Sequence, residues 1–284
     1  MPYALVIALQ RTNDAPLPEA VGEYVHAALF HLIARGSPEL AERLHAVPER
    51  KPFTLGPIQE RRQARAGDTT ALRLTFLDDA LFPAFMDTLL ASILQNQLRV
   101  GAVLFDVTGL FTTPETHPLA GSGRYADLMA ATRDAERVMV RFRTPTVFRS
   151  QGKAVLWPEP RLVWQSWIRT WNAFCGASAP SVDEPALLEV VQQCVSVERY
   201  HLRTRRVVLQ EGACSGFLGT CSYNLRAAPY LERMQLITLA DFSFYAGTGR
   251  KTGMGMGQTQ RIFPKASPRP ALSAGSTPFL PQEE

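Results

Sequence analysis

The stretch EYVHAALFHLIARGSPELAERLH, residues 23–45, decides how the first part of the chain folds. Four of its apolar side chains recur at the spacing of one helix face: Val25, Leu29, Leu32 and Ile33. The helix that they predict ends at Gly36, because glycine commonly terminates a helix. Ser37 and Pro38 suit the N-cap and first position of a second, shorter helix, which we expect to end near His45.

Strand-like segments lie on both sides of these helices. An apolar run, residues 3–10, precedes them, and two short β-patterned runs, residues 52–58 and 71–77, follow them. A third helix over about residues 80–94 and a strand near residues 101–107 complete the first half. The resulting order, β-α-β-β-α-β, is typical of a ferredoxin-like domain.

The same order returns in the second half when two consecutive helices are treated as one elaborated crossover. The predicted strands cover residues 136–150, 195–210, 214–225 and 258–263, and the predicted helices cover residues 159–174, 184–194 and 229–245. We therefore expect an α+β fold with two tandem ferredoxin-like (RRM-like, βαββαβ) domains. The segment Gly121-Ser122-Gly123 predicts their boundary, with domains over residues 1–122 and 123–263. Five prolines among the last 21 residues predict a disordered tail, residues 264–284.

Composition and charge narrow the class of protein. A chain of 284 residues is long enough for two folded domains. Residues 126–284 hold 19 Lys and Arg against 13 Asp and Glu, a net charge of +6, whereas residues 1–125 hold 11 against 13. The sequence shows no long apolar run and no secretion signal, so we expect a cytoplasmic protein without a membrane partner. Four cysteines match no zinc pattern and are expected to be packing residues: Cys175, Cys194, Cys214 and Cys221.

The sharpest local motif is GTGRKTGMGMG, residues 247–257. Its glycines permit positive φ and close approach of a phosphate to the backbone, and its two cations add charge. It is not a Walker loop, because Arg250 stands before Lys251 and the segment runs from a helix into a strand. A dinucleotide fingerprint fails because Thr252 stands where the third glycine belongs. The candidate anion-binding residues are Gly247, Gly249, Arg250, Lys251, Gly253, Gly255 and Gly257, and the alternative is a structural connection with exposed charges.

Arginines crowd two predicted strands of the same basic half. The candidates for a polyanion-binding surface are Arg143, Arg199, Arg203, Arg205 and Arg206. Alternation places Arg203 and Arg205 on one strand face and Arg206 on the other, so one face cannot present all of them. A solvated strand face is the alternative. The combination of basic strands with a basic glycine loop favours binding of a polyanion.

Three of the five histidines, His26, His31 and His45, fall within twenty residues. His26 and Phe30 share a helix face at positions i and i+4, whereas His31 lies about 100° round the helix from Phe30. A single histidine in such a segment is more often a surface or packing residue. Because no H-E-x-x-H spacing occurs, the sequence predicts neither a metal site nor a cofactor.

Four segments resemble the CRISPR-associated endoribonuclease that cuts repeat RNA into guide units, a member of the RAMP superfamily. They are LFHLIARGSPELAERLHAVPERKPFTLGPI (29–58), FRTPTVFR (142–149), GFLGTCSYNL (216–225) and LADFSFYAGTGRKTGMGMGQ (239–258). The resemblance implies two ferredoxin-like domains, recognition of repeat RNA and metal-independent cleavage. In that reaction the 2′-hydroxyl attacks the adjacent phosphate, which leaves a 2′,3′-cyclic phosphate and a 5′-hydroxyl.

The resemblance also implies which residues act. The histidine that follows the second helical segment matches His45, and the lysine before the next strand matches Lys51. Some relatives carry a tyrosine where Phe30 stands here, and phenylalanine cannot transfer a proton. His31 and His26 are therefore the competing candidates for a second proton-transfer group, unless His45 works with Lys51 alone.

Two other functions stay open from the sequence. A catalytically inactive RAMP subunit of a CRISPR effector complex binds RNA without cutting it, and the missing tyrosine is compatible with that role. An enzyme that uses the glycine loop as an ATP cradle is disfavoured by the direction of that loop. The partners that the resemblance implies are precursor and product guide RNA, with other effector-complex subunits and a homodimer as further expectations.

Overall fold

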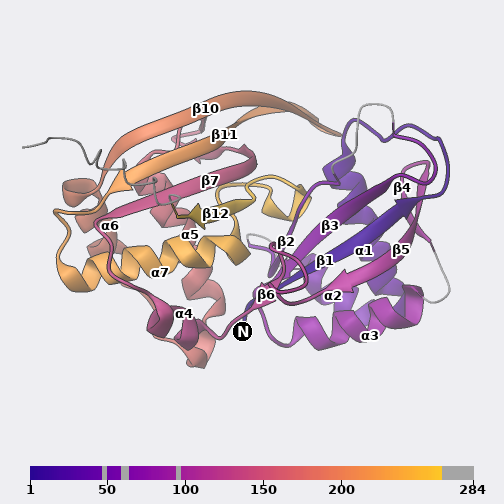
Figure 1. The fold of residues 1–284 in the computed structure, drawn as a ribbon, viewed down its shortest axis with the longest axis horizontal. Coiled ribbons are helices and arrows are strands. Elements are labelled where there is room, and N and C mark those ends of the chain that lie inside the picture. The colour runs from indigo at the N-terminus through magenta and orange to yellow at the C-terminus, as the bar shows by residue number, and fades with distance from the viewer. Residues whose placement is uncertain (47–49, 59–63, 94–96, 264–284) are drawn as a thin grey trace, which may run out of the picture.

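The structure is a computed structural model that describes residues 1–46, 50–58, 64–93 and 97–263, so the predicted tail lies outside the described residues. The described residues form two large antiparallel sheets that lie side by side and one small two-stranded sheet (Figure 1). The first sheet consists of β1 (Tyr3–Arg11), β2 (Phe53–Leu55), β3 (Thr69–Phe76), β4 (Leu98–Val100), β5 (Val103–Phe111) and β6 (Gly121–Ser122). The second consists of β7 (Arg137–Thr146), β10 (Ser196–Leu209), β11 (Gly212–Asn224) and β12 (Thr259–Ile262).

Both sheets have the same topology. The first runs β2-β3-β1-β5-β4, with β6 paired to β1, and the second runs β10-β11-β7-β12. The principal strands are β1, β2, β3 and β5 in the first sheet and β7, β10, β11 and β12 in the second. Numbered 1 to 4 along the chain, they give the order 2-3-1-4 in both sheets, which is 4-1-3-2 seen from the other edge. This arrangement, with helical crossovers, is the ferredoxin-like fold. The predicted α+β class with tandem ferredoxin-like domains is confirmed.

Three helices cover one face of the first sheet: α1 (Val21–Gly36), α2 (Pro38–Ala46) and α3 (Leu81–Ile93). The predicted stripe of α1 is buried at Val25, Leu29 and Ile33, against alternate residues of β1 and apolar residues of α3. Each such buried side chain contributes about 1.5–3 kcal/mol. The Leu40 amide donates to the Ser37 hydroxyl over 3.3 Å, so the predicted N-cap of the second helix is confirmed.

The second sheet packs on α5 (Pro160–Phe174) and α7 (Tyr230–Ala246), with α4 (Tyr125–Ala131) and α6 (Glu184–Cys194) beside them. Trp164, Trp167 and Trp171 of α5 are fully buried at the centre of this core. The sequence analysis missed α4, β4, β6 and β9 (Lys153–Val155), and its strand over residues 136–150 merged β7 with β8 (Phe148–Ser150), which forms a small hairpin with β9. All four cysteines are free thiols, buried or half-buried. No described helix is long and apolar enough to cross a membrane.

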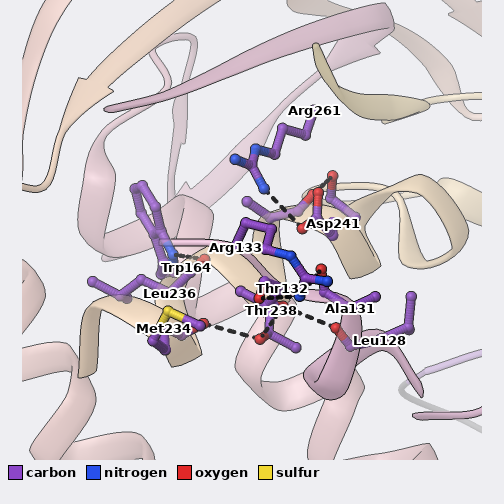
Figure 2. Close-up of polar contacts among 12 residues, drawn as sticks. Leu128, Ala131, Thr132, Arg133, Trp164, Met234, Leu236, Thr238, Asp241 and Arg261 are labelled. Carbon is purple, nitrogen blue, oxygen red and sulfur yellow. Dashed lines mark hydrogen bonds and ion pairs between the residues drawn. The ribbon is translucent and has the colours of Figure 1, made fainter. Parts of the chain in front are cut away.

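Polar contacts fix the position of α7 (Figure 2). The Trp164 indole donates to the Leu236 carbonyl over 3.1 Å, and the hydroxyls of Thr132 and Thr238 lie 2.8 Å apart. About one turn farther along α7, an ion pair of 2.8 Å joins Asp241 to Arg261. These contacts come from α5, from the end of α4 and from β12. With α7 held in this position, its C-terminal end contacts the first domain.

The joint between the domains lies at that end of α7. Arg73 of β3 donates to the Phe244 carbonyl over 2.7 Å and to the Gln258 amide oxygen over 2.6 Å. Thr75 donates to the Tyr245 carbonyl over 2.8 Å, which satisfies another of the helix's terminal acceptors. Burial lowers the pKa of Arg73 to about 9, which leaves the guanidinium cationic at neutral pH. The glycine loop follows α7 directly, so this joint places the loop in contact with β2 and α1.

Candidate active site and nucleic-acid interface

The structure brings three of the four candidate catalytic residues together. His26 comes from α1, His45 from the last turn of α2, and Lys51 from the segment before β2. The Phe30 ring connects the two imidazoles, with its centroid 4.6 Å from that of His26 and 5.9 Å from that of His45. Phe30, which cannot itself transfer a proton, therefore packs against both histidines.

His26 is half-buried at the contact between the domains. Its Nδ1 lies 3.0 Å from the carbonyl oxygen of Gly253, in the glycine loop. Burial lowers the pKa of His26, and the charges of Lys51 and His45 lower it further, against the opposing effects of the Gly253 carbonyl and Glu23. The neutral imidazole is thereby favoured at neutral pH.

Lys51 ties its segment to the end of α2. Its ammonium donates to the Leu44 carbonyl over 2.9 Å and to the His45 carbonyl over 3.1 Å, where the helix dipole favours a cation. Burial lowers the pKa of Lys51. Because an ammonium has three protons, one donor is left for a ligand. The neighbouring Arg50 donates to the Thr170 hydroxyl over 2.9 Å and links the same segment to α5.

His31 is placed differently. Its side chain is exposed on α1, and none of the described ring contacts and hydrogen bonds of the cluster involves it. His45 is also exposed, but its ring meets the edge of Phe30. The geometry therefore groups His26, and not His31, with His45 and Lys51.

The glycine loop packs on the first domain instead of standing free. Gly247, Gly253, Gly255 and Gly257 are buried, Gly249 is half-buried, and a Cβ on Gly253 would lie 3.4 Å from the Phe53 ring. The loop's short 3-10 turn, Thr252–Met254, contacts β2 and α1. Arg250 is exposed and Lys251 half-buried. Gly253 and Gly255 thus permit close packing on the first domain, and the two cations lie nearer the surface.

A basic groove of about 1030 Å³ opens between the domains. Its charged lining includes four of the arginines predicted to bind a polyanion: Arg143, Arg203, Arg205 and Arg206. Arg199 is exposed farther along β10 and is not among the lining residues. A second cavity of about 370 Å³ shares Arg143 and reaches His117. The groove also meets Met254 and Gly255 of the glycine loop, so the basic surface extends to the turn that contacts His26.

Strand alternation did not separate the arginines as expected. The pairing of β11 with β7 stops at Phe217, so the outer part of the β10–β11 hairpin is a two-stranded ribbon beyond the sheet. Both faces of such a ribbon are open, and Arg206 lines the groove together with Arg203 and Arg205. The ribbon extends to the first domain, as Figure 1 shows. There the backbone N–H of Gln210 donates to the Glu23 carboxylate over 2.6 Å.

Ion pairs hold some arginines of the second domain but, among the described residues, none of the four that line the groove. Carboxylates hold five of them among the described residues: Arg137, Arg169, Arg226, Arg233 and Arg261. No described ion pair holds Arg143, Arg203, Arg205 or Arg206. The groove is therefore lined by arginines whose charge no described ion pair neutralises.

Comparison with known proteins bears directly on this site. The family model for the CRISPR Cas6 N-terminal domain matches residues 1–130, and the model for CRISPR-associated endoribonuclease Cas6 matches residues 140–259. The solved product complex of a Thermus thermophilus Cas6 is 35% identical with a TM-score of 0.81, and the match covers 92% of this chain and 100% of that chain. This chain belongs to the Cas6 family.

Other Cas6 proteins extend the comparison. A Cas6 substrate mimic complex is 26% identical with a TM-score of 0.68, over 92% of this chain and 99% of that chain. The CRISPR-associated endoribonuclease Cas6 of Mycobacterium tuberculosis is 25% identical over 277 residues, which cover 90% of this chain and 79% of that protein. The resemblance seen in the four sequence segments is thus confirmed, and it places the chain among the RNA-cleaving enzymes of CRISPR RNA processing.

Several residues that position the candidate site escaped the sequence analysis. Arg73 carried a signal, because an arginine between leucines in a buried strand must find partners. Gly22 carried a weaker one as a glycine in the first turn of a helix. Glu23 carried none, since its partner Gln210 is 187 residues away.

Proposed function

We propose that this Cas6-family chain cuts CRISPR precursor RNA within the repeat by metal-independent transesterification. The 2′-oxygen forms a bond to the adjacent phosphorus while the bond from phosphorus to the 5′-oxygen breaks. The products are a 2′,3′-cyclic phosphate and a 5′-hydroxyl. The reaction needs a base for the 2′-hydroxyl proton, an acid for the 5′-oxygen and a cation for the phosphorane's added charge.

The observation that carries this proposal is the cluster of two imidazoles and one ammonium around Phe30. His26 is assigned as the base, because its lowered pKa favours the neutral ring that accepts a proton. The exposed His45 is assigned as the acid that protonates the leaving oxygen. Lys51 holds His45 through the backbone and has one ammonium proton left for the phosphate.

The proposed RNA path follows the positive charge. The groove arginines are assigned to contact phosphates, and so are Arg250 and Lys251, which belong to the same glycine loop as the groove residues Met254 and Gly255. The groove and the histidine cluster meet at the turn Thr252–Met254, which lines one and contacts the other. Arg199 is assigned to the outer part of the bound repeat, because it lies on the same strand beyond the groove.

A denaturing gel of a labelled repeat transcript tests the chemistry. Cleavage should continue in excess chelator, stop when the scissile position carries a single 2′-deoxy substitution, and yield a 5′ fragment ending in a cyclic phosphate. Loss of cleavage on chelation, with recovery on added metal, would reject the metal-independent route.

The same gel tests the second candidate, an RNA-binding RAMP subunit without activity. The absence of an ionisable side chain at Phe30 favours that alternative. It predicts tight binding of the repeat with no chelator-resistant product. The position of His26 beside Phe30 favours cleavage, because it supplies a second proton-transfer group to the same cluster.

A further inference from the structure

We propose that the backbone carbonyl of Gly253 is a positioning group that holds His26 in its Nδ1–H tautomer, so that Nε2 is the atom that takes the proton. This inference rests on the proposed function for its catalytic meaning. Its structural content, the tautomer of His26, is a property of the free protein.

The tautomer follows from hydrogen-bond chemistry. A carbonyl oxygen can only accept, and Nδ1 of His26 lies 3.0 Å from the oxygen of Gly253. Nδ1 must therefore carry the proton and donate it. A neutral imidazole has a single N–H, so Nε2 then has a free lone pair. When Nε2 accepts the 2′-hydroxyl proton, Nδ1 keeps its own, and the same carbonyl stabilises the imidazolium.

The loop is built to present this carbonyl. The amides of Met254 and Met256 donate to the Lys251 carbonyl over 2.9 and 3.3 Å and close a tight turn around Gly253. Lys251 adopts the left-handed conformation, with φ of 57°, and Gly255 follows with φ of 86°. Gly253 itself packs on the Phe53 ring, whose centroid lies 5.9 Å from that of His26. The turn and the imidazole are thus held against the same ring.

Gly22 makes the arrangement testable without altering His26 or the loop sequence. It lies in the first turn of α1, and a Cβ on it would come 2.0 Å from the Met254 carbonyl oxygen. Alanine favours the helix more than glycine does, so Gly22→Ala should not weaken α1 by itself. It must instead displace the turn that carries the Gly253 carbonyl.

Gly36→Ala is the matched control. Gly36 lies at the other end of α1, where a Cβ would meet the Thr88 side chain at 2.4 Å. The two variants therefore introduce the same methyl group, on the same helix, against a close neighbour. Only Gly22→Ala reaches the loop.

The experiment records ¹⁵N chemical shifts of the His26 ring by long-range ¹H–¹⁵N NMR, with assignment by His26→Asn, and cleavage rates over a pH series. Wild type and Gly36→Ala should show protonated Nδ1 and bare Nε2 above the pKa of His26. Gly22→Ala should lose this preference and cleave at least about tenfold more slowly, with repeat binding within a few-fold. The acidic limb of the pH–rate profile of Gly22→Ala should also move. The displaced turn no longer offers the Gly253 carbonyl to the His26 ring, whose other charged neighbours are Glu23, His45 and Lys51.

Two results would overturn the inference. One is an Nε2–H tautomer in the wild type, which needs no variant to fold. The other is a folded Gly22→Ala protein with unchanged tautomer and rate. If His26→Asn cleaves like the wild type while the Nδ1–H tautomer is present, the assignment of His26 as base fails and the inference about Gly253 loses only its catalytic meaning.

Discussion

Arg73 in β3 donates a 2.7 Å hydrogen bond to the carbonyl of Phe244, although the two residues are 171 positions apart. The guanidinium also lies over the Phe244 ring, 4.3 Å from its centroid, and donates to the Leu119 carbonyl over 2.9 Å. One buried arginine thereby joins strand β3, the end of α7 and the segment before β6. The position of the glycine loop against His26 depends on this joint.

Replacing Arg73 should therefore destabilise the protein. Arg73→Met keeps an aliphatic stem but leaves several buried acceptors without donors, and we expect a loss of about 3 kcal/mol in the free energy of unfolding. Urea unfolding followed by circular dichroism measures it. The control is Arg99→Met, at an exposed arginine of β4, which should change stability by less than about 0.5 kcal/mol. Equal midpoints for the two variants would contradict the joint.

His45→Ala should abolish cleavage and leave binding of the repeat within a few-fold. His31→Ala is the matched control on α1, because His31 is exposed and outside the cluster. Single-turnover rates on labelled repeat RNA, with affinities from filter binding, separate the two effects. Full cleavage by His45→Ala, or loss of cleavage in His31→Ala alone, would reverse the assignment.

The pH dependence of cleavage should report His26. Because burial lowers the pKa of His26 below 6.5, the neutral base predominates above that value and is lost as the pH falls through the lowered pKa. We expect kcat/KM to decline on the acidic side with a midpoint below 6.5, and this limb to vanish in His26→Asn. An acidic midpoint above 6.5 would contradict burial as the controlling influence.

Lys51 should matter through its charge and through its contacts with α2. Lys51→Met retains the stem but removes both hydrogen bonds to the end of α2, and we expect cleavage to fall about 100-fold. Lys51→Arg restores a cationic donor and should recover part of that loss. Lys153→Met, at an exposed lysine of β9, should cleave at the wild-type rate. The proposed role is wrong if Lys51→Met cleaves equally well.

The glycine-loop cations should set part of the salt dependence of RNA binding. Arg250→Ala combined with Lys251→Asn removes two charges, and asparagine tolerates the left-handed backbone of position 251. Losing two phosphate contacts should reduce the slope of log K against log salt by about 1.5–2. Arg149→Ala with Lys153→Ala removes two exposed charges from the β8–β9 hairpin and should leave the slope unchanged.

Sequence patterns predicted the elements of the fold well because the patterns are local. The α1 stripe at Val25, Leu29 and Ile33 and the Ser37 cap depend only on residues within a few turns. The short pieces were missed for the same reason. Strand β6 has two residues and exists only because β1 offers Tyr3 and Ala4 as pairing partners.

The members of the candidate site were proposed from the sequence, whereas their arrangement was not. Spacing showed that His26 and Phe30 share a face, and the resemblance pointed to His45 and Lys51. The preference for His26 over His31 needed the contact with Gly253, a residue 227 positions away. The sequence likewise left open whether the glycine loop binds an anion or is a structural connection, because it does not reveal that Gly253 packs on Phe53.

The pairing of arginines with carboxylates outside the groove affects how fast RNA arrives. A neutralised pair contributes little at long range, so an approaching strand senses mainly the cations that no described carboxylate holds, and the groove arginines are among them. Diffusional encounter should be accelerated by these unpaired cations, and its rate should fall steeply with ionic strength although the formal net charge is only +4. Where charges sit, more than how many there are, governs the speed of capture.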